Sequence, residues 1–461
     1  MRALSGVLFE RYRCPDAFLN LTLRGRLSAD PGFFQFGSDA ICYGRSSVGY
    51  LRSQIGPDLY DLTQDIILGS SEVCLPFDPV EVIDNLRLER YPGAKDSWIR
   101  SRAREAYYFL RPVLHRLARQ QIQRTQLGRQ KGVAFPNWPV DRTVENICEQ
   151  ILLLALQVSG ADRIPFIWFW PRGARGSVLM THDVETERGR DFCAQLMDID
   201  DSFGIKASFP IVPERRYSVS PQFLATIRDR GFEISIQDLN HDGRLFNERE
   251  QFLKRADRIN KYARAYGAKG FRAAVLYRKP DWYDALDFSH DMSIPNSARL
   301  DPQRGGCCTV MPYFIGNILE LPVTTTQDYT LFNLLGERSI ELWRKQIELI
   351  LEKNGLVTFI VHPDYVMDDE LMPLYKELLN YLRKLQETAG IWLTLPSEVD
   401  RWWRERSKMQ LVPCGDEWRI EGEGAARAIL AYARIVEGKL VYEMETGCAG
   451  LRKSRELSPK L

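Results

Sequence analysis

An apolar run that ends in ionisable side chains, from Val178 to Glu185, is the stretch of this sequence best suited to chemistry. Such a run predicts a buried parallel strand that opens into a site. Because side chains alternate along a strand, Thr181, Asp183 and Glu185 share one face, while His182 lies on the other. Two carboxylates at a strand end can act as a general base and as a metal ligand. Acids in this position can also simply cap the following helix.

Three of the five histidines fall where a predicted strand ends: His182, His241 and His362. Arg272 stands near the start of another predicted strand, 270–276. A single histidine in such a place is commonly structural, with its hydrogen bonds satisfied. Three at equivalent strand ends, beside Asp183, favour a shared site, because barrel folds place their chemistry at the carboxyl ends of their strands.

The order of these motifs resembles that of the polysaccharide deacetylases of the NodB-homology type, over residues 175–400. The first motif of that family is similar to Thr181-His-Asp-Val-Glu185, and the resemblance implies Asp183 as the catalytic base and Glu185 as a metal ligand. The second motif, His-x-x-x-His, falls on Gln237-Asp-Leu-Asn-His241. The resemblance therefore implies Gln237 and His241 as the other candidate metal ligands.

The later motifs add two catalytic candidates and a groove. Arg272 matches the arginine that holds the base carboxylate in the family, and His362 matches the histidine that acts as general acid. The resemblance also implies a substrate groove with four candidate residues: His182, Trp282, Asp291 and Tyr365.

The resemblance therefore implies a hydrolase that removes acetyl groups from an N- or O-acetylated glycan or sugar intermediate. A divalent metal, zinc or a similar ion, would polarise the acetyl carbonyl and lower the pKa of a bound water. Asp183 would accept the proton of that water, and His362 would protonate the leaving amine. The chain departs from the family pattern where Gln237 replaces a histidine and Glu185 replaces an aspartate. Because an amide oxygen is a poor zinc ligand, the metal is expected to be weakly held, a harder ion or absent.

Three functions therefore stay open at the level of the sequence. The first is a working deacetylase, and the second is a barrel that binds a glycan or a partner enzyme without turnover. The third is a metal-independent amidohydrolase of the same fold, similar to the allantoinase branch that lacks the metal histidines. Metal analysis of the purified protein separates the first function from the third.

Strand-like runs alternate with helical ones after Trp168, which predicts an α/β fold with a (β/α) barrel. Seven strands are expected, so the barrel would be incomplete or distorted. A mixed α/β accessory region would occupy residues 1–170, the barrel residues 171–408, and a small β-rich appendage with a tail residues 409–461. The expected strands are 177–185, 206–212, 232–239, 270–276, 318–323, 356–362 and 391–395, and the expected helices between them are 189–203, 221–230, 247–266, 338–353 and 370–388.

A predicted helix over residues 98–130 has arginine at most of its polar positions and apolar residues such as Tyr107, Leu110 and Leu114 on its other face. Such a basic amphipathic stretch can contact an anionic membrane or a polyanion. It can equally be a solvated face, or pair with acids on a neighbouring domain.

Composition limits the remaining partners. A net charge of +1 does not predict a nucleic acid partner. The partner that the family resemblance implies is an acetylated carbohydrate. Nine cysteines, including the adjacent Cys307 and Cys308, favour reduced thiols. Charged residues appear too early in the first ten residues for a secretory signal, so a cytoplasmic location is expected. If segment 98–130 binds an anionic membrane, the protein would be associated with the membrane surface. The sequence does not indicate an oligomeric state.

Overall fold

The computed structural model describes residues 4–93, 135–415 and 417–445. The arginine-rich segment 98–130 lies outside these residues, so its helix and its contact with an anionic membrane stay predictions. Within the described ranges, no helix combines the length and the hydropathy that a membrane crossing requires.

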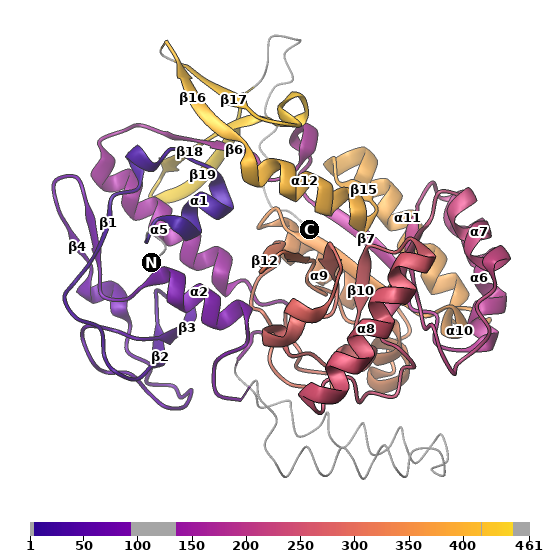
Figure 1. Cartoon of the computed structure of the whole chain (residues 1–461). Helices are drawn as coiled ribbons and strands as arrows, with labels where there is room; N and C mark the ends of the chain where they lie inside the picture. Colours follow the sequence, from indigo (N-terminus) through magenta and orange to yellow (C-terminus); the bar gives the residue numbers. More distant parts are fainter. Residues whose placement is uncertain (1–3, 94–134, 416, 446–461) are drawn as a thin grey trace.

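A curled sheet of nine strands forms the centre of the second half of the chain (Figure 1). The strands follow the order β12-β13-β11-β10-β9-β8-β7-β14, and β15 also pairs with β7. The antiparallel edge strand is β12 (Tyr313–Ile315). The eight parallel strands are β7 (Ser177–His182), β8 (Ala207–Ile211), β9 (Glu233–Gln237), β10 (Gly270–Arg272), β11 (His290–Asp291), β13 (Ile318–Glu320), β14 (Leu356–Val361) and β15 (Trp392–Thr394).

The predicted α/β fold with a parallel, distorted barrel is confirmed at this level. Each of the seven expected strands is a strand of the sheet. The sequence prediction missed β11 and β12, because two or three residues are too few to show an alternating pattern.

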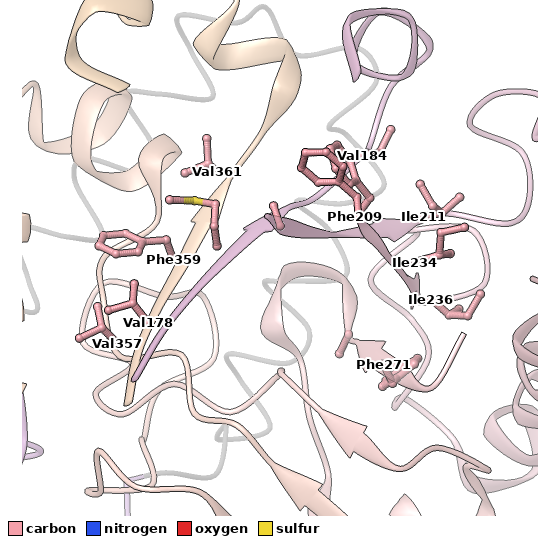
Figure 2. Packing of buried hydrophobic residues seen from close by; sticks show 14 of the residues in the cluster. Val178, Val184, Phe209, Ile211, Ile234, Ile236, Phe271, Val357, Phe359 and Val361 are labelled. Carbon is pink, nitrogen blue, oxygen red and sulfur yellow. The ribbon is translucent and has the colours of Figure 1, made fainter. Parts of the chain in front are cut away.

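Apolar side chains on one face of the sheet form its main hydrophobic layer. Val178, Phe209, Ile234, Phe271 and Phe359 come from five consecutive strands and belong to one buried cluster (Figure 2). Because neighbouring residues of a strand face opposite sides, the residues between them face the inside of the barrel.

Amphipathic helices cover this outer layer. They are α6 (Glu187–Ser202), α7 (Pro221–Asp229), α8 (Arg249–Tyr266), α9 (Glu341–Leu351) and α11 (Met372–Ala389). Side chains of all five helices join the buried cluster. Local capping defines two of the helix starts: Thr186 Oγ1 accepts from the N–H of Gly189 at 3.0 Å, and Ser220 Oγ accepts from the N–H of Phe223 at 3.1 Å.

Threonine side chains connect the barrel where strand pairing is missing between β13 and β14. Thr324 Oγ1 donates to the carbonyl oxygen of Leu356 at 2.9 Å and accepts from the N–H of Thr358 at 2.9 Å. Thr325 Oγ1 donates to the carbonyl oxygen of Thr358 at 2.8 Å. Side chains therefore satisfy backbone groups of β14 that lack a neighbouring strand.

The C-terminal strands join the N-terminal region. Strand β18 (Leu430–Val436) pairs with β6 (Ile164–Ile167) and with β19 (Lys439–Met444). The hydroxyls of Tyr12 and Tyr442 lie 2.8 Å apart. The domain boundaries at residues 170 and 408 stay predictions.

The remaining helices and strands are α1 (Gly6–Tyr12), β1 (Leu21–Leu23), β2 (Gly32–Gln35), β3 (Ile41–Gly44), β4 (Ile67–Leu68), β5 (Val73–Leu75), α2 (Pro79–Arg87), α5 (Thr143–Ser159), α10 (Pro363–Val366), α12 (Pro396–Lys408), β16 (Gln410–Cys414) and β17 (Glu417–Glu421).

Candidate active site

The carboxyl ends of four parallel strands bring polar side chains into one cluster. β7 leads to Asp183 and Glu185, β9 ends at Gln237, β10 ends at Arg272, and His362 follows β14. The strand register places Arg272 directly beside Gln237. These positions are the ones where parallel barrels hold their sites.

The carboxylate of Glu185 is the centre of this cluster. Its Oε1 lies 3.1 Å from Gln237 Nε2 and 2.7 Å from His241 Nε2. His362 Nε2 approaches the same oxygen at 3.5 Å. Gln237 Nε2 also donates to Asp183 Oδ2 at 3.2 Å, so the amide of Gln237 bridges the two carboxylates.

Burial and neighbouring charges shift the pKa values of the two carboxyl groups in opposite directions. The side chain of Glu185 is 20% exposed, whereas that of Asp183 is 5% exposed. Burial raises the pKa of Asp183, and the positive charges of Arg272 and His362 oppose this only in part. Burial also acts to raise the pKa of Glu185, but His241 and His362 outweigh it and hold that pKa well below its usual value. The more buried acid is therefore the better proton acceptor near neutral pH.

Arg272 links the base candidate to the wall of the barrel. It is fully buried, and its Nη1 lies 3.7 Å from Asp183 Oδ2. Its Nη2 donates to Thr181 Oγ1 at 3.1 Å, and that hydroxyl donates to the carbonyl oxygen of Phe359 at 2.7 Å. The chain of contacts fixes the guanidinium beside Asp183.

Asp328 contacts His362 through the ring nitrogen that does not face Glu185. Asp328 Oδ1 lies 2.6 Å from His362 Nδ1, and Oδ2 accepts from the N–H of His362 at 2.7 Å. Burial alone would lower the pKa of His362, but Asp328 and Glu185 raise it well above its usual value. The Tyr365 ring lies 5.0 Å from the imidazole and stacks on Tyr329. His362 is therefore held as a cation whose Nε2 points at Glu185.

A different partner holds His241. Arg216 Nη2 lies 2.9 Å from His241 Nδ1 and donates to its carbonyl oxygen at 3.1 Å. A guanidinium has only donors, so Nδ1 must accept and the ring proton is assigned to Nε2. That nitrogen is the one facing Glu185.

The backbone is strained where β9 and β10 end. Asp238 and His241 have φ of 53° and 54°, and Val275 and Leu276 have φ of 59° and 54°. Non-glycine residues rarely occupy this region, and it is costly for a β-branched residue such as Val275. Strain of this kind clusters at functional sites, where the surrounding structure enforces it.

One predicted groove residue, His182, does not reach the cluster, and its prediction is wrong. It lies on the outer face of β7, where its Nε2 is 2.8 Å from Asp200 Oδ2. Tyr375 donates to the other oxygen of Asp200 at 2.5 Å. The alternation of the strand turns His182 away from Asp183, so it is a satisfied core histidine.

Two other groove predictions also fail. The Trp282 ring packs against Phe252 of α8, with ring centroids 5.3 Å apart, on the outside of the sheet. Asp291 is in register with Phe271, whose ring belongs to the outer layer, so its side chain also leaves the barrel interior. Asp291 accepts from the Ser293 hydroxyl at 2.6 Å. Tyr365 alone of the four groove candidates lies beside the site.

Sequence reasoning missed three residues of the site. Asp328 follows β13 after a run of polar residues, which is the only signal that could have drawn attention to it. Arg216 lies in the loop after β8 and carries no local signal. Asp364, in α10, has a buried Oδ1 without a partner, and its pKa is raised by burial, with His362 opposing.

No protein-family model and no curated protein matches the sequence. Among solved structures, the fold is similar to a putative polysaccharide deacetylase from Mycobacterium smegmatis, with 17% identity, a TM-score of 0.43, and coverage of 54% of this chain and 98% of that one. It is similar to the allantoinase PuuE (13% identity, TM-score 0.39, coverage 51% and 92%). A probable polysaccharide deacetylase from Pseudomonas aeruginosa PAO1 gives 11% identity, a TM-score of 0.41, and coverage of 51% and 93%. At these values the roles of individual residues have to be inferred from the site itself.

Proposed function

We propose that this protein is a hydrolase that removes acetyl groups from an N- or O-acetylated carbohydrate. The supporting observation is the placement of a base candidate with a raised pKa, Asp183, and an acid candidate held as a cation, His362, around Glu185. Two titratable groups whose environments suit opposite proton transfers are the usual sign of a general base and a general acid. The carbohydrate part of the proposal rests on the order of motifs in the sequence.

The reaction needs one proton acceptor and one proton donor. A water molecule attacks the acetyl carbonyl carbon, and Asp183 accepts the proton that the water loses. Arg272 orients the Asp183 carboxylate during this transfer. The bond from the acetyl carbon to the sugar nitrogen or oxygen then breaks, and His362 Nε2 donates its proton to the departing atom. The products are acetate and a free amine or hydroxyl.

The cluster can hold a divalent metal. Donor atoms of Asp183, Glu185 and His362 lie within 4.8 Å of one another, and Asp183 Oδ1 is buried without a partner. Because His362 Nε2 carries the proton for the leaving group, the carboxylates of Asp183 and Glu185 would hold the ion during the reaction, and oxygen ligands suit a manganese-like or magnesium-like ion. When bound, the metal would polarise the acetyl carbonyl and acidify a water.

A second candidate function is metal-independent amide hydrolysis in the same site. The contact between Arg216 and His241 favours it, because it places the proton of His241 on the nitrogen that faces the cluster. Gln237 also turns an amide N–H₂ toward both carboxylates. Gln237 donates to Oε1 of Glu185, and His241 and His362 lie beside the same oxygen, so this carboxylate has partners without a metal ion.

Acetate release tests the proposal. Purified protein is treated with a chelator and then assayed on N-acetylglucosamine oligomers and on acetylated xylan, with and without added zinc, cobalt or manganese. Asp183→Asn should lower kcat by about 10²–10⁴-fold. Asp291→Asn is the matched control, since Asp291 lies on the other face of the same sheet, and it should stay within about threefold of the original rate.

The outcomes separate the functions. Activity that requires added metal supports the metal-assisted reaction, and full activity after chelation supports the metal-independent one. If the protein binds these glycans but releases no acetate in any arm, the hydrolase proposal fails and a binding role remains.

A further inference from the structure

A cavity lies where the N-terminal helices meet the barrel, and it shares no lining residue with the Glu185 cluster. Its volume is about 170 Å³. Residues of α1, α2, β12 and α12 form its wall, at the junction that Figure 1 shows between the two halves of the chain. Three arginines line it: Arg13, Arg87 and Arg406. A cavity of this size has room for several water-sized groups, and therefore for a small ion.

Two of these arginines are buried cations without an anionic partner. Arg13 is 8% exposed and Arg406 is 1% exposed. Within the described ranges, no carboxylate lies within 4 Å of either guanidinium. Arg13 Nη2 donates to the carbonyl oxygen of Met409 at 2.6 Å, and Arg406 donates to the carbonyl oxygens of Trp168 and Ile167. Arg87 differs, since it pairs with Glu10 at 2.8 Å.

Aromatic rings fix the three guanidinium groups. The Arg13 guanidinium lies 3.9 Å from the centre of the Phe9 ring, that of Arg87 lies 5.2 Å from Tyr313, and that of Arg406 lies 5.2 Å from Trp403. Stacking on a ring leaves the edge of a guanidinium, which carries the N–H donors, free to bind. Arg13 Nε and Arg87 Nε are both buried and donate to no acceptor.

Helix capping accounts for only part of this arrangement. Arg13 follows the end of α1 and Arg406 lies in the last turn of α12, where positive charge is favourable. The carbonyl contacts satisfy some donors, yet they neutralise neither charge. Burial, together with the charges of Arg13 and Arg11, lowers the pKa of Arg406 to about 9. A buried cation without a counterion is costly, so an anion in the cavity would stabilise the fold.

We propose that this cavity binds a phosphate group, either inorganic phosphate or that of a small phosphate monoester. Three arginines and two acids, Glu10 and Asp84, line the cavity, so it keeps a net positive charge that favours an anion. Carbonyl oxygens accept from Nη2 of Arg13 and from Nε and Nη2 of Arg406, which leaves the Nη1 group of each of these two arginines as a donor for a phosphate oxygen. The rings of Phe9 and Trp403 line the same cavity and offer contacts to the organic part of a monoester. This site is independent of the proposed hydrolase reaction.

Binding of phosphate to the full chain tests the inference. Calorimetric titration with sodium phosphate, with a hexose phosphate and with sodium chloride at matched ionic strength distinguishes the two sources from a general salt effect. Arg13→Gln keeps a donor for the Met409 carbonyl but removes the charge, so it should weaken binding about tenfold or more. Arg401→Gln removes an arginine of α12 that pairs with Glu398 outside the cavity, and binding should not change.

A second variant keeps the test decisive if Arg13→Gln does not fold. Ser407→Asp places a carboxylate at the cavity wall, where it should pair with the arginines. The melting temperature should then rise, and phosphate binding should disappear. The inference is overturned if phosphate does not bind the original chain more tightly than chloride does. It is also overturned if neither Arg13→Gln nor Ser407→Asp changes phosphate affinity.

Discussion

Arg216 and His241 form a contact of 2.9 Å between Nη2 and Nδ1, and this contact determines what His241 can bind. A metal-binding imidazole normally donates its second N–H to a carboxylate or carbonyl, which leaves its other nitrogen free for the ion. His362 has that arrangement, because its Nδ1 faces Asp328. His241 has the reverse, because its Nδ1 faces a donor. The histidine that the sequence motif implies as a metal ligand is therefore oriented to hold Glu185.

Arg216→Ala should raise the affinity for a divalent metal. Without the guanidinium, the ring proton of His241 can move to Nδ1, and Nε2 becomes available as a ligand. The expected gain is about tenfold, the lower end of what a change in the partner of a metal ligand produces. Equilibrium dialysis against zinc and manganese measures it. Arg215→Ala, which removes the neighbouring exposed arginine, is the control, and an equal gain there would contradict this assignment.

Gln237→His should raise metal affinity further, because it replaces an amide by an imidazole between Asp183 and Glu185. The gain should be largest when it is combined with Arg216→Ala, since two imidazole nitrogens are then available. A double-mutant cycle on the metal dissociation constants checks this coupling. Additive effects of the two substitutions would show that His241 does not bind the ion. Tight metal binding without acetate release would locate the defect in substrate binding.

The prediction of the strand ends succeeded because the barrel is built from apolar runs with polar ends. The runs before Asp183, Gln237 and His362 are four to six residues long and bounded by turns, so their ends could be located from the sequence. Parallel strands place their carboxyl ends at one edge, and this brought the predicted residues together. The strand β11 has no such run, because it consists of only His290 and Asp291, and the sequence does not predict a strand there.

The sequence predicted two features less well: the direction in which side chains point, and the residues that contact the site residues from other parts of the fold. His182 and Asp183 are adjacent, and only the strand alternation decides that the first faces Asp200 and the second the cluster. Asp328 and Arg216 act through tertiary contacts with His362 and His241, over sequence distances that no local pattern records. Whether His241 and His362 can bind a metal ion depends on those contacts.

Asp328→Asn should shift the pH dependence of the reaction. The active form needs Asp183 without its proton and His362 with its proton. The Asp328 carboxylate helps to raise the pKa of His362, so its removal lowers that pKa. The falling limb of kcat/KM should move to lower pH, while the rising limb, set by Asp183, should stay in place. The pH profile of acetate release measures both limbs, and a shift of the rising limb alone would contradict the acid role of His362.

Asp291→Asn should make the stability less sensitive to pH. Burial and the neighbouring Asp291 raise the pKa of Glu320 well above its usual value. The folded state therefore keeps a proton that the unfolded state has released, and the free energy of unfolding falls as pH rises from the unfolded pKa of Glu320 through its folded pKa. Removing the Asp291 charge lowers the folded pKa, so less stability is lost.

The difference in the free energy of unfolding between Asp291→Asn and the original chain should favour the variant more at pH 8 than at pH 4.5. The change between the two pH values should be about 1 kcal/mol, the usual size of a single-residue effect. Urea unfolding at the two pH values measures it. Asp287→Asn is the control, since that side chain is 72% exposed, and it should show no such difference. If Asp291→Asn lowers stability equally at both pH values, the loss of its hydrogen bond to Ser293 dominates, and the carboxylate pair does not govern the pH dependence.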